Sequence, residues 1–99
     1  MITRAENQTT LRPEGDVVAG AVPELRTALR GLMREGVREL VIDLANVGMV
    51  DSMGLGLLIA THNSLRKVGG QLSVVRASAD ILQLLTTMRI HQHFSITGE

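Results

Sequence analysis

Hydrophobic positions in the first third of the chain change from a strand pattern to a helix pattern. Two short β-prone segments, Ile2–Ala5 and Thr9–Arg12, flank a polar turn, which predicts a β-hairpin. From Pro23, a residue suited to a first helical turn, apolar side chains recur every three or four residues and predict a helix that ends at Arg34. Gly36 is the flexible residue expected just past that end. The predicted inner face of this helix contains Val22, Leu25, Leu29, Leu32 and Met33.

The middle of the chain repeats the change of pattern. Leu40–Leu44 is a short, mostly apolar run, typical of a strand that is buried on both faces within a parallel sheet. A helical pattern follows and ends at Gly69 and Gly70. Its predicted inner face contains Leu55, Leu58, Ile59, His62 and Leu65, with His62 at the border of the core.

The last third predicts one more strand and one more helix. The strand is Leu72–Val75, Ser78 is a good N-cap for the helix, and His91–Ile96 is predicted as a terminal strand or an extended tail. The apolar stripe of the helix contains Ile81, Leu82, Leu85 and Met88. Because strands and helices alternate, we expect one α/β domain with right-handed crossovers. Its mixed β-sheet would have a parallel centre and be covered by amphipathic helices.

Composition narrows the classes of function. The 99 residues carry ten basic and ten acidic side chains, and Phe94 is the only aromatic residue. This composition provides neither the basic field nor the stacking rings that nucleic-acid binding uses. The chain has no cysteine, so it has no disulfide and no thiolate nucleophile. The longest apolar stretch, Leu55–Ala60, is far shorter than the roughly 20 residues of a membrane span. We therefore expect a cytoplasmic protein. A spacing of four residues places Arg26, Arg30 and Arg34 on one helix face, which we expect to be solvated.

Asp51 and Ser52 lie where the predicted loop passes into the second helix. The first N–H groups of a helix lack intrahelical partners and carry the positive end of its dipole, so a phosphate on Ser52 would be tolerated there. Gly54 and Gly56 have no side chains and would let a partner or a kinase approach the hydroxyl. The alternative is that Ser52 is an ordinary N-cap and that the glycines allow close helix–sheet packing.

The segment Val41–Leu58, V-I-D-L-A-N-V-G-M-V-D-S-M-G-L-G-L-L, resembles the signature of the STAS domain family, in particular its stand-alone bacterial anti-sigma factor antagonists. The resemblance extends over one domain, residues 1–99. It implies that Ser52 is phosphorylated by an anti-sigma factor with serine kinase activity, that a phosphatase reverses the modification, and that the chain itself is not an enzyme. The partner-binding residues that it implies are Val50, Asp51, Ser52, Met53, Gly54, Leu55 and Gly56.

Three departures from the family pattern accompany this resemblance. Met53 stands where relatives often have a second serine or threonine. Val18, in Gly15-Asp16-Val17-Val18, stands where an aspartate is frequent. The chain ends at Glu99, about where relatives continue into a last C-terminal helix, so we expect that helix to be absent.

Other chemistries fit the residues less well. Val50 replaces the glycine that a hydrolase nucleophile elbow needs, and His91 and His93 lack a third metal ligand, so we expect no catalytic residue, no metal and no cofactor. A different role within the same fold stays open: an unswitched scaffold, or an accessory subunit, in a stress-signalling complex or a lipid-type ABC transporter. An open sheet edge would also allow two copies to pair as a homodimer.

Overall fold

The computed structural model describes residues 1–98. Within them the predicted alternation of strands and helices is confirmed. In chain order the elements are β1 (Ile2–Arg4), β2 (Thr9–Leu11), α1 (Val22–Arg34), β3 (Glu39–Asp43), α2 (Ser52–Lys67), β4 (Gln71–Ala77), α3 (Ala79–Thr87), the 3-10 helix η1 (Ile90–Gln92) and β5 (Ser95–Gly98).

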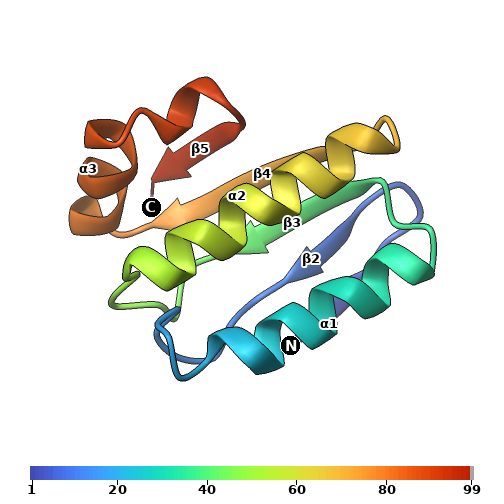
Figure 1. Cartoon of the computed structure of the whole chain (residues 1–99), viewed down its shortest axis with the longest axis horizontal. Coiled ribbons are helices and arrows are strands. Elements are labelled where there is room, and N and C mark those ends of the chain that lie inside the picture. Colours follow the sequence, from blue (N-terminus) through green and yellow to red (C-terminus); the bar gives the residue numbers. More distant parts are fainter. Residues whose placement is uncertain (99) are drawn as a thin grey trace.

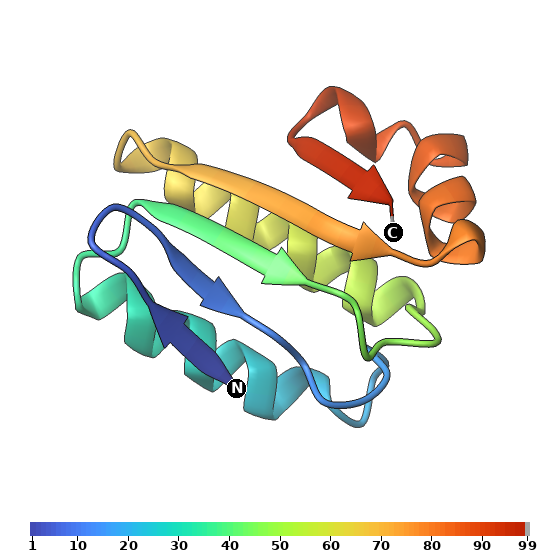
Figure 2. The same ribbon diagram turned by 180° about the vertical axis from the view of Figure 1, so that it is seen from behind.

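The five strands form one mixed sheet in the order β1-β2-β3-β4-β5. The hairpin strands β1 and β2 are antiparallel, whereas β2, β3, β4 and β5 are parallel, as the sequence predicts. Helices α1 and α2 lie together on one face of the sheet (Figure 1), and the reverse view shows the strands in front of both helices (Figure 2). The helices therefore cover one face, and the carboxyl ends of β2 and β3 lead into the loops that precede α1 and α2.

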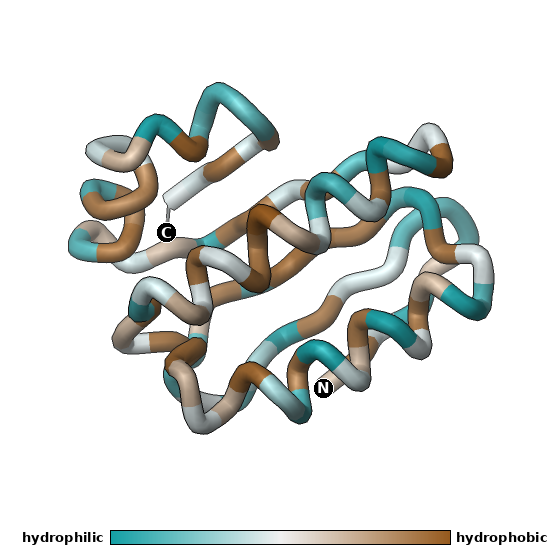
Figure 3. Tube along the Cα trace, viewed as in Figure 1, coloured by the Kyte–Doolittle hydropathy of each residue, from teal (hydrophilic) through white to brown (hydrophobic). Residues whose placement is uncertain are grey.

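Helix α1 forms where its sequence signals converge. Pro23 lies in the first turn, Glu24 and Arg34 complement the dipole at the two ends, and Gly36 follows with a φ of +89°. Its buried residues are Val22, Leu29 and Leu32. Figure 3 shows the hydrophobic positions of the chain gathered on the central strands and on the helix faces, while the turn between β1 and β2 is hydrophilic.

The core lies between the sheet and the two covering helices. Its most completely buried leucines come from both layers and include Leu32, Leu40, Leu58 and Leu65. Two residues predicted for the inner helix faces lie outside it, because Ile59 is 37% exposed at the margin of α2 and Met88 is 57% exposed just past the end of α3. No helix of residues 1–98 has the length and apolar character needed to cross a membrane.

The prediction of an extended segment over His91–Ile96 is partly wrong. The chain leaves α3 through Arg89, which has a left-handed φ of 59°, then forms the single turn η1 and begins β5 only at Ser95. Ile90 and Phe94 are both buried, and a helical turn holds two core residues four positions apart much closer together than an extended strand would.

A buried carboxylate ends the central strand. Asp43 is 4% exposed, and its Oδ2 accepts a hydrogen bond from Arg12 Nε at 3.2 Å, while Arg76 Nε donates to its Oδ1 at 3.0 Å. Arg76 Nη2 contacts the same carboxylate. Because these guanidinium groups, together with the Ala45 amide, stabilise the charged form, the pKa of Asp43 is lowered. Arg76 has a positive φ of 53° at the irregular part of the β4–β5 pairing.

Candidate functional site

The loop before α2 ends at a side-chain cap. Asp51 is the N-cap residue, and its Oδ1 accepts a hydrogen bond from the Gly54 amide at 2.9 Å. Its Oδ2 accepts one from the Ala19 amide, also at 2.9 Å, which ties the loop before α1 to the start of α2. These backbone donors, Gly54 first and Ala19 second, lower the pKa of Asp51. The interpretation of Ser52 as the N-cap is therefore wrong: Ser52 is the first residue of the helix.

A second carboxylate joins the same two loops. Asp16 Oδ1 accepts hydrogen bonds from the amides of Gly48 and Met49, at 2.9 and 3.1 Å. Val17 and Val50 form a parallel β-bridge between these contacts and those of Asp51. The loops before α1 and α2 thus form one connected platform, which holds the start of α2 in place.

The two glycines of the motif have different surroundings. A Cβ on Gly54 would lie 2.1 Å from the carbonyl oxygen of Val17, so only glycine fits where the helix crosses the neighbouring loop. A Cβ on Gly56 would meet nothing within 4 Å. The packing interpretation therefore holds for Gly54, whereas Gly56 lies in an open part of the surface.

The partner-binding residues implied by the resemblance divide into a surface set and a buried set. Ser52, Met53 and Gly56 are exposed and Asp51 is half-buried, but Val50, Gly54 and Leu55 are buried and can act only by supporting the others. The Ser52 side chain is exposed, and Asp51, not Ser52, supplies the side-chain cap of the helix. The Ser52 hydroxyl is therefore available to a reagent or a partner.

The sequence interpretation missed three members of this platform. Met49 is 57% exposed beside the motif, and Asp16 and Ala19 supply the contacts that fix the loops. The Gly15-Asp16 pair was a signal for the loop before α1, but it gave no indication of the atoms that the carboxylate holds.

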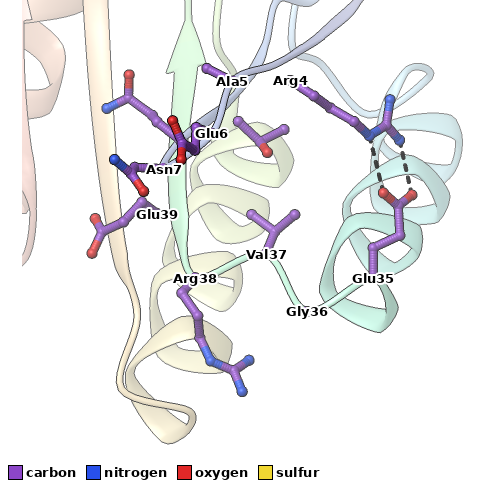
Figure 4. Close-up of a pocket in the computed structure, with 11 residues that line it drawn as sticks. Arg4, Ala5, Glu6, Asn7, Glu35, Gly36, Val37, Arg38 and Glu39 are labelled. Carbon is purple, nitrogen blue, oxygen red and sulfur yellow. Dashed lines mark hydrogen bonds and ion pairs between the residues drawn. The ribbon is translucent and has the colours of Figure 1, made fainter.

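A cavity of about 350 Å³ lies at the other end of the sheet, between the turn after β1 and the connection from α1 to β3. In Figure 4, Arg4 and Glu35 point toward each other beside this cavity and form a bidentate ion pair. Arg4 Nε donates to Glu35 Oε1 at 3.0 Å, and Arg4 Nη2 donates to Oε2 at 2.9 Å. Glu6, Arg38 and Glu39 also line this cavity, so its charges are of both signs. It is separate from Ser52, which follows the carboxyl ends of the strands.

Replacing Asp51 with alanine should loosen the platform without unfolding the domain. Two backbone amides would lose their acceptor, so we expect hydrogen exchange at Ala19 and Gly54 to accelerate on the order of tenfold. Ser52→Ala is the matched control, and it should leave both exchange rates unchanged. Acceleration in Ser52→Ala but not in Asp51→Ala would show that the serine, and not the aspartate, caps the helix.

The chain belongs to the STAS domain family, whose model matches residues 1–98. It is 32% identical over 84 residues to the anti-sigma-B factor antagonist of Staphylococcus aureus, which covers 85% of this chain and 69% of that protein. The protein of the same name from Staphylococcus epidermidis is 33% identical over 84 residues, with the same coverage.

Solved structures confirm the fold. The Thermotoga maritima protein TM1081 superposes with a TM-score of 0.93 at 15% identity, over 100% of this chain and 86% of that one. The unphosphorylated form of the anti-sigma factor antagonist SpoIIAA gives a TM-score of 0.75 at 18% identity, over 100% and 86% of the two chains. The phosphorylated form, from Bacillus, gives 0.76 at 16% identity, over 100% and 91%. The single α/β domain with its mixed sheet is therefore the fold of these proteins.

Proposed function

We propose that this chain is an anti-sigma factor antagonist, which binds an anti-sigma factor through the surface around Ser52 and thereby releases a sigma factor. The observation that carries the proposal is an exposed serine in the first turn of α2, on a platform fixed by Asp16 and Asp51. The name of the Staphylococcus relatives, at 32% and 33% identity, supports the same role.

The docking surface contains apolar groups that a partner can cover. Met49 and Met53, on either side of Ser52 in the sequence, are 57% and 52% exposed. One helical turn after Ser52, Gly56 has no side chain and open space around it. Methionine side chains adapt to irregular surfaces, and removing their area from water favours association. In its unmodified state Ser52 adds a neutral hydroxyl, which costs little to bury when it is hydrogen-bonded.

Phosphorylation of Ser52 would switch this surface off. It adds about −1.5 to −2 charges beside the Asp51 carboxylate, which already accepts the amide of Gly54 in the first turn of α2. The new dianion therefore stays in solvent, and docking would require its desolvation next to a like charge. A cost of about 2.7 kcal/mol lowers the affinity 100-fold. In this scheme the anti-sigma factor is also the serine kinase, a phosphatase restores the hydroxyl, and the chain is a substrate and not an enzyme.

The test is affinity capture from lysate of the native organism with four baits: wild type, Ser52→Ala, Ser52→Asp and Ser64→Asp. Ser64 is an exposed serine about three turns further along the same helix, so it controls for added charge. We expect the first two baits and Ser64→Asp to capture one protein with a kinase fold, and Ser52→Asp to bind it about 100-fold more weakly. Incubation of the purified pair with ATP should place one phosphate on Ser52, as determined by mass spectrometry.

Two results would contradict the proposal. If all four baits capture the same partner equally, the chain is an unswitched scaffold or accessory subunit, and Ser52 has no regulatory role. If the captured protein phosphorylates another residue, or none, the switch does not lie at Ser52.

A further inference from the structure

A second cavity lies at the amino-terminal ends of β4 and β5. It is near the C-terminal end of α2, whereas the loop platform lies at the N-terminal end of that helix. Its volume is about 290 Å³, and its polar lining consists of His62, Arg66, Gln71, Ser73, His93 and Ser95. Ser73 and Ser95 are register partners in the parallel pair β4–β5, so this is the point where the two strands begin to separate. Figure 1 shows β5 beside β4.

One wall of the cavity is formed by a buried imidazole. His62 is only 7% exposed, its ring packs against Phe94 at a centroid distance of 5.3 Å, and it faces His93 at 6.0 Å. Burial first, and then the nearby Arg66 and His93, lower the pKa of His62. A neutral imidazole has one N–H donor and gains a second when it is protonated, so His62 can contribute a donor to a ligand in this cavity.

The charges that surround His62 select the sign of that ligand. The charged or titratable groups lining the cavity are His62 and Arg66 from α2 and His93 from the segment before β5, and the lining includes no carboxylate. Strand β4 contributes Gln71 and Ser73, which are neutral. A metal ion would be repelled by the Arg66 guanidinium, and residues 1–98 contain no group of three histidine, aspartate or glutamate side chains that could hold one. An anion in this cavity would meet the Arg66 guanidinium and polar side chains that can all donate hydrogen bonds, with no carboxylate to repel it.

We propose that the cavity bounded by His62, Arg66 and His93 binds a small oxyanion of the phosphate class, either free or as the phosphoryl group of a small metabolite. Arg66 supplies the fixed charge and the planar donor geometry that phosphate accepts. The imidazoles supply donors that become stronger when they are protonated. This site is independent of Ser52 and would exist whether or not the serine is phosphorylated.

The binding should depend on pH in a defined direction. An anion beside His62 favours the protonated imidazole, so binding raises the pKa of His62, and the affinity for sulfate, which stays a dianion, increases as the pH falls from about 8 to about 6. Arg66 supplies a fixed positive charge, so it adds affinity without adding pH dependence.

The experiment is an NMR titration of the histidine side-chain resonances of the full chain with inorganic phosphate, sulfate and glycerol phosphate, at pH 6 and pH 8. We expect saturable shifts of His62 and His93, stronger binding of sulfate at pH 6 than at pH 8, and at least about tenfold weaker binding in Arg66→Gln. Arg34→Gln, a change of an exposed arginine on α1, should bind like the wild type.

The choice of ions distinguishes the source of the phosphate. Saturation by inorganic phosphate indicates a free ion, whereas saturation by glycerol phosphate alone indicates a phosphorylated metabolite; both support the site. Shifts that do not saturate with any of the three ions, or that are equal in Arg66→Gln and Arg34→Gln, overturn the proposal. The readout does not use partner capture, so its failure would leave the proposed antagonist role unaffected.

Discussion

Gly54→Ala should lower the free energy of unfolding by about 3 kcal/mol, at the upper end of the range for overpacked sites. The added methyl group would lie 2.1 Å from the Val17 carbonyl oxygen and 2.9 Å from Val17 Cγ1. The nearest atom belongs to the backbone of a loop fixed by the Val17–Val50 bridge, so it cannot move aside as a flexible side chain could. To accommodate the methyl group, the loop before α1 must separate from α2, which also disrupts the proposed docking surface.

Gly56→Ala is the matched control for this prediction. It makes the same chemical change two residues further along the same helix, where a Cβ meets nothing within 4 Å. Because alanine is the better helix former, this variant should be more stable than the wild type by about 0.5–1 kcal/mol. In urea unfolding, the free energy of unfolding should be lower than that of the wild type for Gly54→Ala and higher for Gly56→Ala. Equal stability of Gly54→Ala and the wild type would show that the helix and loop are not in contact at this point.

Local patterns were sufficient to predict the order of the elements. The short run at Leu40–Leu44 became the central strand β3 because its residues are buried on both sides of the sheet, and the helix from Pro23 ended where Arg34 and Gly36 indicate. These signals arise within one element, so they can be recognised without knowledge of the tertiary contacts.

The identity of the helix cap could not be decided in this way. Asp51 and Ser52 are adjacent, and both residue types are good N-caps, so a shift of one residue is invisible to pattern analysis. The choice depends on the Ala19 amide, which donates to Asp51 from a loop 32 positions earlier in the chain. Asp16 reaches Gly48 across the same separation. Such contacts follow from the tertiary fold, and the periodicity of the sequence contains no trace of them.

In the C-terminal part, too, tertiary contacts decide the local structure, here through burial in the core. The sequence predicts an extended segment over His91–Ile96, but Ile90 and Phe94 both reach the core, and the turn η1 brings them closer together than a strand would. Burial of these two side chains outweighs the local pattern. The turn also brings His93 next to His62, which the sequence spacing does not suggest.

Asp43→Asn should destabilise the protein by about 2 kcal/mol at pH 7, because it leaves two arginines without the buried carboxylate that they share. The estimate lies below the usual range for a broken buried pair, since the Arg12 and Arg76 side chains are 41% and 47% exposed and water can screen their charges. Arg76 also holds a left-handed backbone conformation at this contact, so the irregular β4–β5 pairing should loosen with it.

The pH dependence of stability identifies the carboxylate as the cause. The pKa of Asp43 is lower in the folded protein than in the unfolded chain, so its charge contributes stability above about pH 4, and that contribution is lost as the pH falls through the folded-state pKa. In urea unfolding, the difference in the free energy of unfolding between wild type and Asp43→Asn should therefore be largest at pH 7 and decrease steadily below about pH 4. Glu35→Gln is the control, because it breaks an exposed ion pair with Arg4 in which both side chains are about half exposed. Its free energy of unfolding should be almost the same as that of the wild type at any pH. A difference for Asp43→Asn that stays constant into acid would attribute the loss to packing and not to the ion pair.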